Sequence, residues 1–141
     1  MSTAWFSHAF SDVIRFAKSR PVMVSTSFTN LTVDLIRVPK YAFVTGLRVL
    51  ITTPLSGGTS PSLTIGYSGN GTTAVTSGFM ISTVVDPGTA GMKNMKDGVI
   101  STAPGSQGKY FSGGAGVVTA TLSGTPTAGV FYVFVDYRVI Y

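Results

Sequence analysis

The sequence has 141 residues, of which 44% are hydrophobic and only 11% are charged. This length fits one domain with its own hydrophobic core, and the hydrophobic, charge-poor composition excludes intrinsic disorder. The chain contains no cysteine, which excludes disulfide bonds and thiolate metal sites. No apolar run approaches the roughly 20 residues that cross a bilayer, so we expect no membrane partner.

The formal net charge is +5, from ten Lys and Arg residues against five Asp and no Glu. The basic residues are scattered apart from one loose cluster, Arg15–Arg20, and form no run typical of a nucleic-acid-binding tract. We therefore expect no direct nucleic-acid site. The modest positive field would still favour an acidic protein partner or nearby DNA.

Residues 4–19 have the periodicity of an amphipathic helix. At 100° per residue, their apolar side chains fall in one half of a helical wheel and their polar side chains in the other. Pro21 disfavours continuation of the helix past Arg20. The sequence therefore predicts a short N-terminal amphipathic helix, which forms an arm over residues 1–20. Its apolar half contains Trp5, Phe6, Ala9, Phe10, Val13, Ile14, Phe16 and Ala17.

After Pro21 the sequence is rich in β-branched residues, and turn signals such as Asp86–Pro87–Gly88 separate the segments. This pattern predicts an all-β, single-domain β-sandwich over residues 21–141, with jelly-roll or Greek-key connectivity. Residues 86–109 are rich in Gly, Lys, Met and Pro, so we expect a long loop there. The expected strands lie within residues 22–38, 41–53, 61–67, 75–85, 108–113, 116–123 and 129–141.

The last segment, residues 129–141, alternates regularly between its two faces. One face carries only apolar and aromatic residues, from Phe131 and Val133 through to Tyr141. The opposite face mixes aromatic residues with Asp136 and Arg138. A continuous apolar face is what a core-facing strand requires, so we expect this segment to be a central strand.

The glycine-rich stretch at residues 61–75 is a candidate phosphate-binding loop. A Walker-type loop needs Lys where Thr72 stands, and a dinucleotide-binding loop leads into a helix. The residues after Thr72 are β-branched and favour a strand instead. Asn70–Gly71 is a preferred pair for a hairpin turn, so we interpret the stretch as a chain reversal.

Residue types that carry catalysis are scarce. The only histidine, His8, lies on the polar half of the predicted helix, so a Ser nucleophile has no obvious base. The five Asp residues form neither a clustered calcium loop nor an evident pair for a two-carboxylate hydrolase. The sequence predicts no catalytic residue, no cofactor and no metal site.

Two segments are candidate contact surfaces. The aromatic face of the N-terminal helix is too large to leave in water. It can fold over the sandwich, dock on another chain or lie on a membrane surface. Membrane binding has less support, because the helix carries few cations to attract anionic lipid. The Met- and Lys-rich loop is either solvated or a flexible contact surface. The candidate partner-binding residues are Trp5, Phe6, Phe10, Ile14, Arg15, Lys18, Arg20, Met92, Lys93, Met95 and Lys96.

Residues 41–83 resemble small β-rich decoration, or cement, proteins of tailed bacteriophages. In that family a strand containing Gly and paired Thr residues precedes a Gly/Thr/Ser loop and a segment of the form P-x-L-x-I-G. The whole chain is also similar to the jelly-roll cement protein of a Bordetella bacteriophage. The matching positions are Phe43, Val44, Thr45, Gly46, Val49, Ile51, Thr52, Thr53, Pro61, Leu63, Ile65 and Gly66.

The resemblance implies a non-enzymatic virion protein that is made in the host cytoplasm and bound to the outer capsid surface. Its partner would be a major capsid protein with the HK97-type fold. It would bridge capsomers against the pressure of packaged DNA, as a dimer or another small homo-oligomer.

Two other classes of protein stay open. One is a virion tail or host-attachment β-sandwich that binds carbohydrate through exposed aromatic residues. The other is a small hydrolase or isomerase on a jelly-roll scaffold, for which a single His offers little support. The aromatic residues considered for a sugar site are Tyr67, Tyr110, Phe111 and Tyr132.

Overall fold

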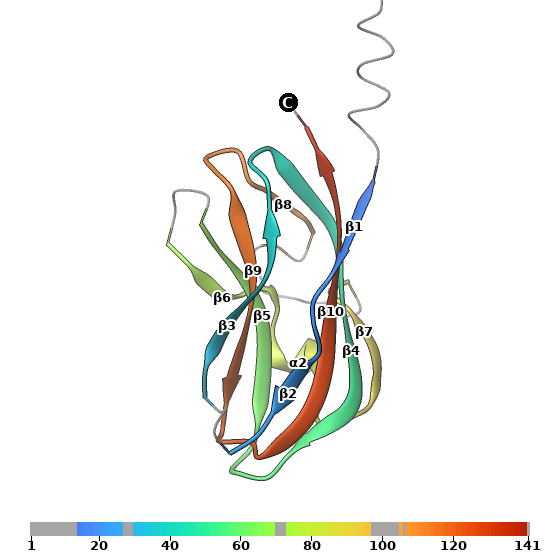
Figure 1. The fold of residues 1–141 in the computed structure, drawn as a ribbon, viewed down its shortest axis with the longest axis vertical. Helices are drawn as coiled ribbons and strands as arrows, with labels where there is room; N and C mark the ends of the chain where they lie inside the picture. The colour runs from blue at the N-terminus through green and yellow to red at the C-terminus, as the bar shows by residue number, and fades with distance from the viewer. Residues whose placement is uncertain (1–13, 27–29, 70–72, 97–104, 106, 141) are drawn as a thin grey trace, which may run out of the picture.

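The computed structural model describes residues 14–26, 30–69, 73–96, 105 and 107–140. In these residues the chain forms two antiparallel β-sheets that face one another, plus one short helix, α2 (Ser82–Val85) (Figure 1). This architecture confirms the all-β prediction. The strands are β1 (Arg15–Lys18), β2 (Val22–Val24), β3 (Thr32–Val38), β4 (Ala42–Ser56), β5 (Ser62–Gly69), β6 (Val75–Met80), β7 (Gly91–Asn94), β8 (Lys109–Tyr110), β9 (Gly116–Ser123) and β10 (Ala128–Val139).

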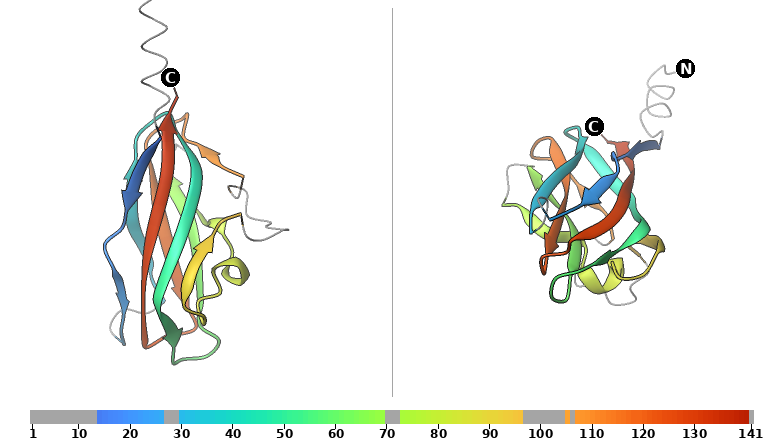
Figure 2. Two further views of the ribbon diagram at one scale, coloured as in Figure 1. Left: turned by 90° about the vertical axis from the view of Figure 1, so that its right-hand side faces the viewer. Right: turned by 60° about the horizontal axis from the view of Figure 1, so that its bottom comes forward.

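The larger sheet is organised around β10. This strand pairs with β4 on one side and, on the other side, with β1 and then β2. The far side of β4 pairs with β7 and β8. Figure 2 (left) shows this sheet face-on, with β10 beside β4. The smaller sheet has the strand order β3-β9-β5-β6, and all of its pairs are antiparallel.

The hydrophobic core lies between the two sheets and follows from strand alternation. Along β10, Phe131, Val133 and Val135 are buried, whereas Tyr132 and Phe134 between them lie half-buried on the outer face. β4 alternates in the same way. A strand that is covered on one face produces this pattern, and the pairing of β10 on both sides confirms that it is a central strand.

The helix predicted over residues 4–19 is wrong where the structure describes the segment. Residues 15–18 form β1, which pairs with residues 134–137 of β10. The apolar spacing has a helical period, but the free side of β10 offers cross-strand hydrogen bonds, and tertiary pairing overrides a weak local propensity. Residues 1–13 lie outside the described residues, so the rest of the predicted arm stays a prediction.

The long loop predicted over residues 86–109 is wrong in part. Residues 91–94 form β7, which pairs with residues 48–51 along the edge of β4. That pairing satisfies backbone groups that a loop would have to expose to water. Residues 97–104 and 106 lie outside the described residues.

The glycine-rich stretch after Pro61 contributes to an antiparallel pair of strands, as the chain-reversal interpretation requires. β5 pairs with β6, and the register shifts between Ile65 and Tyr67, so that Gly66 lies in a bulge. A Cβ atom at Gly66 would collide with the backbone carbonyl of Val75. Gly66 is therefore needed because the backbone of β6 approaches it closely. Asn70 and Gly71 lie outside the described residues.

We predict that Gly66→Ala lowers the free energy of unfolding by about 3 kcal/mol, because the new methyl group meets backbone that cannot rotate away. Gly88→Ala is the matched control, since a Cβ there has no neighbour within 4 Å, and we expect a change within about 0.5 kcal/mol. Denaturant unfolding of both variants measures the difference. Equal destabilisation by the two substitutions would contradict the close approach of β6.

Candidate interaction surface

The connection between β1 and β2 is a bulge held by a buried serine. The Ser19 N–H donates to the Val133 carbonyl at 2.8 Å, and the Val133 N–H donates to Ser19 Oγ at 2.9 Å. The Ser19 hydroxyl donates in turn to the Arg20 carbonyl at 2.9 Å. The side chain of Ser19 therefore replaces a backbone acceptor, and Arg20 is left exposed beside it.

A shallow groove with a volume of about 620 Å³ opens beside this bulge, between β2 and β3. Its lining combines apolar side chains with the charged residues Lys18, Arg20 and Asp34. Met23 is 67% exposed because strand alternation turns it away from the core, on the opposite face from its buried neighbours. We call this feature the β2–β3 groove. Its lining residues are Lys18, Arg20, Pro21, Val22, Met23, Val33, Asp34 and Leu35.

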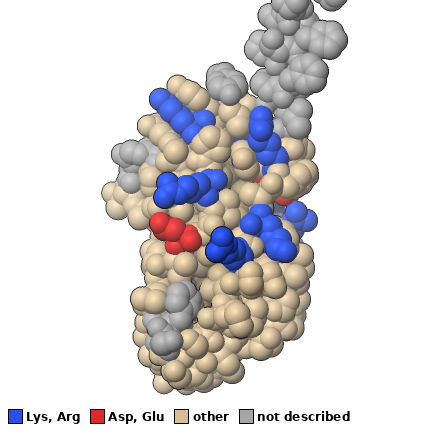
Figure 3. All heavy atoms as spheres, in the orientation of Figure 1, with Lys and Arg blue, Asp and Glu red and all other residues tan. Residues whose placement is uncertain are grey.

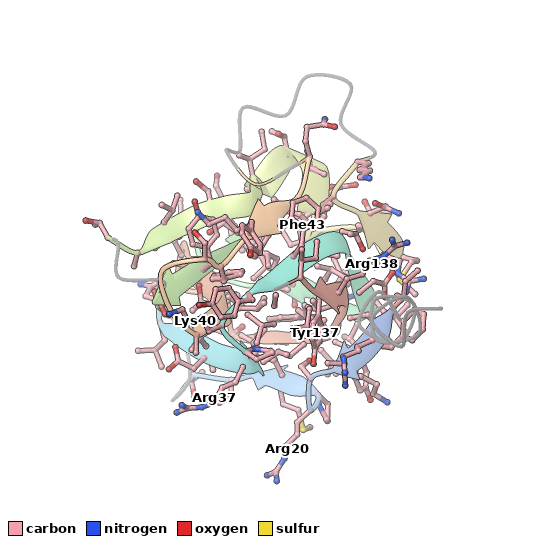
Figure 4. The ribbon with its side chains drawn as sticks, turned by 90° about the horizontal axis from the view of Figure 1, so that it is seen from above. Arg20, Arg37, Lys40, Phe43, Tyr137 and Arg138 are labelled. Carbon is pink, nitrogen blue, oxygen red and sulfur yellow. The ribbon has the colours of Figure 1, made fainter. Side chains whose placement is uncertain are left out.

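Positive charge gathers on the face that contains the groove. Figure 3 shows Lys and Arg side chains over the upper and middle parts of this face, with an acidic side chain beside them, whereas its lowest part shows none. Arg20 and Arg37 both project away from the body of the protein (Figure 4). Neither forms an ion pair with a described residue. The two described ion pairs are Arg48–Asp136 and Lys93–Asp86.

Four of the residues predicted as partner contacts lie together along β1 and its connection to β2. Ile14, Arg15, Lys18 and Arg20 are all exposed there. The Lys18 Nζ lies 5.0 Å from the centre of the Tyr132 ring, and this cation–π contact holds the ammonium group on the outer face of the sheet. The remaining residues of the predicted arm, Trp5, Phe6 and Phe10, lie outside the described residues.

The other four predicted contact residues lie at the opposite edge of the same sheet, on β7 and just after it. β10 and β4 separate the two edges, which corresponds to roughly 14 Å at the usual strand spacing. Met92 and Lys96 are exposed, and Lys93 Nζ lies 3.4 Å from an Asp86 carboxylate oxygen. Met95 is fully buried. Its assignment to a contact surface is therefore wrong, because its side chain packs in the core.

Sequence reasoning missed several residues of the surface. The alternation of Val22, Met23 and Val24 could have identified Met23, since buried Val residues on both sides place it on the opposite face. No local signal places Leu35 of β3 beside β2, because their proximity depends on how the two sheets pack. Phe16, which belonged to the apolar half of the predicted helix, is 72% exposed.

Other kinds of site have less support. The described residues contain no cluster of three or more potential metal ligands among His, Cys, Asp and Glu. No helix within them has the length and apolar character that crossing a bilayer requires. Two of the aromatic residues considered for a sugar site, Tyr67 and Phe111, are buried with their ring centroids 5.9 Å apart. Buried rings cannot form an exposed stacking platform for carbohydrate.

No protein-family model matches the sequence, and no curated protein matches it significantly. The fold is similar to chains in three solved structures of phage capsids. For the capsid asymmetric unit of cyanophage Pam1, the TM-score is 0.66 and the sequence identity 16%, over 93% of this chain and 88% of that chain.

The acid-stable capsid of Helicobacter pylori bacteriophage KHP30 gives a TM-score of 0.62 and 15% identity, over 91% of this chain and 89% of that chain. For the capsid of Ralstonia phage GP4, the TM-score is 0.59 and the sequence identity 14%, over 92% of this chain and 86% of that chain. At such low identity, the agreement shows a shared fold. It does not single out the cement protein of the Bordetella phage.

We predict that Ser19→Ala lowers the free energy of unfolding by about 1–3 kcal/mol, because it leaves the buried Val133 N–H without an acceptor. Ser112→Ala is the control, since Ser112 is exposed and its loss should cost less than about 0.5 kcal/mol. Chemical denaturation measures both. A loss for Ser19→Ala no larger than for the control would show that the bulge does not depend on this hydroxyl.

Proposed function

We propose that this chain is a structural protein of a bacteriophage virion. The observation that carries the proposal is the similarity of nearly the whole two-sheet fold to chains of three phage capsids, with TM-scores of 0.59 to 0.66. The similarity extends over more than four fifths of each of those chains, so it concerns a complete fold rather than a shared hairpin. A non-enzymatic role agrees with the scarcity of catalytic residue types in the sequence.

We further propose that the fold is a jelly-roll. The strand order supports it: β2, β10, β4 and β7 lie side by side in one sheet, and β3, β9, β5 and β6 in the other. Successive strands therefore fall in different sheets at most steps along the chain, as two wrapped Greek keys require. β1 and β2 pair with successive parts of the same side of β10, so together they occupy one strand position of the jelly-roll. In the same way, β7 and β8 pair with successive parts of one side of β4 and occupy one position.

Within the virion, the proposed role is decoration of the outer capsid surface. The chain binds a major capsid protein with the HK97-type fold and bridges neighbouring capsomers, as a dimer or another small homo-oligomer. The physical properties of the surface support this role. A charge-poor surface packs beside copies of itself with little repulsion, and many copies that share modest contacts give a strong attachment without one very tight interface.

The proposed contacts begin at the edge of the larger sheet that β1 forms. The sequence that precedes β1 carries the aromatic residues Trp5, Phe6 and Phe10, which we propose to belong to the same contact. Exposed apolar side chains continue along the same edge with Phe16 and Met23. Apolar residues gathered along one edge are typical of a protein–protein contact.

We predict that purified virions contain this chain in near-equimolar ratio to the most abundant shell protein. Quantitative mass spectrometry with labelled reference peptides from both proteins measures the ratio. A decoration protein repeats with the shell lattice, so its copy number must follow that of the shell. A few to a few tens of copies per virion would contradict decoration and favour a tail or host-attachment role. Complete absence would contradict a virion role.

A further inference from the structure

We propose that the β2–β3 groove binds an extended, acidic segment of a neighbouring shell subunit. The inference rests on the proposed virion function and names the chemistry of the partner. Three properties of the groove support it: its bordering strands have unpaired edges, its lining contains apolar side chains, and two of its three charged residues are basic.

The backbone beside the groove can accept an added strand. Among the described residues, β2 pairs only with β10 and β3 only with β9, so each strand presents one unpaired edge. Unpaired strand edges offer N–H and C=O groups to an extended peptide, which gains affinity from main-chain hydrogen bonds. An extended segment therefore fits this place better than a helix or a small molecule.

The side chains that line the groove indicate which residue types the bound segment carries. Pro21, Val33 and Leu35 contribute apolar side chains to the lining, which suits alternate apolar side chains of a bound strand. Lys18 and Arg20 also line the groove, and the Arg20 guanidinium has no acidic partner among the described residues. Asp or Glu side chains of the segment can satisfy these cations with charge-assisted hydrogen bonds.

A second copy of this chain is a poor occupant. The sequence has no Glu and only five Asp. Asp86 and Asp136 already form ion pairs, and Asp34 lies in the groove itself. Pairing two such grooves would bring like charges together, which disfavours association. A second copy has only Asp12 and Asp97 left to offer, so a different protein is the better source of the acidic groups.

Nucleic acid is also a poor occupant. A phosphate backbone is recognised by several cations acting together, whereas this groove has only Lys18 and Arg20. The apolar residues of the lining also have no counterpart in a sugar–phosphate backbone. A protein segment that carries apolar residues and an acidic side chain beside Arg20 matches the apolar and the basic residues of the lining.

The test is binding of the full-length protein to purified shells that lack it, measured by co-sedimentation. We predict that Arg20→Glu raises the apparent Kd on the order of tenfold at low salt, because it places like charges in the contact. Lys40→Glu, which makes the same change in net charge at an exposed position outside the groove, should bind like the unmodified protein. High salt should reduce the difference between the two variants.

Thermal unfolding controls for folding, and we expect Arg20→Glu to unfold at the same temperature as the unmodified protein because Arg20 is exposed and unpaired. Equal binding by the two variants would overturn the groove proposal and leave the virion role intact. Failure of the unmodified protein to bind shells would overturn both the groove proposal and the decoration role. Binding of the unmodified protein to short double-stranded DNA, lost in Arg20→Glu while shell binding is kept, would replace the acidic segment by nucleic acid.

A photo-crosslinking amino acid at Leu35 provides an independent readout on the same shells. Leu35 lines the groove, so crosslinking should capture one peptide of the shell protein, and mass spectrometry should find Asp or Glu beside the crosslinked residue. Crosslinks only between copies of this chain, or to a peptide rich in Lys and Arg, would overturn the proposal.

Discussion

The pairing of β10 with β4 is the interaction on which the other elements depend. The two strands run together from the Ala128–Ser56 pair to the Val139–Ala42 pair, and their inward side chains supply one wall of the core. Every other strand of the larger sheet attaches to one of these two. β10 and β4 are each long enough to pair with two short strands, one after the other, along the side that faces away from the β10–β4 pairing. The short strands β1, β2, β7 and β8 exist because those sides are available for pairing.

Much of the fold could be predicted because long strands carry their own signal. The alternation in residues 129–141 identified both the strand and its buried face, and the segment at 116–123 matches β9. Short strands carry no such signal. Arg15–Lys18 has only four residues, and its conformation is set by residues 134–137, which lie far away in the sequence. β7 was missed for the same reason, since its conformation depends on the edge of β4.

Of the two walls of the candidate site, only the one formed by β1 and its connection to β2 could be predicted from the sequence. The cluster from Arg15 to Arg20 was recognised as polar, and the structure does place these cations together, although along a strand edge rather than on a helix. The opposite wall comes from β3, which approaches β2 only through the packing of the two sheets. Met95 is the opposite case, a residue that was predicted to lie at the surface but is buried. Composition suggested a flexible Met- and Lys-rich surface, but the alternation that begins with β7 turns this side chain into the core.

The position of β10 also constrains when the protein can fold. Among the described strands it is synthesised last, yet β1, β2 and β4 all need it as a partner. While the ribosome makes the chain, these three strands have exposed edges and no completed sheet to join. Folding of the larger sheet must wait for its final strand, and pairings over such long sequence separations form slowly. A nascent chain of this kind is exposed to aggregation, so a high rate of synthesis would increase its need for chaperones.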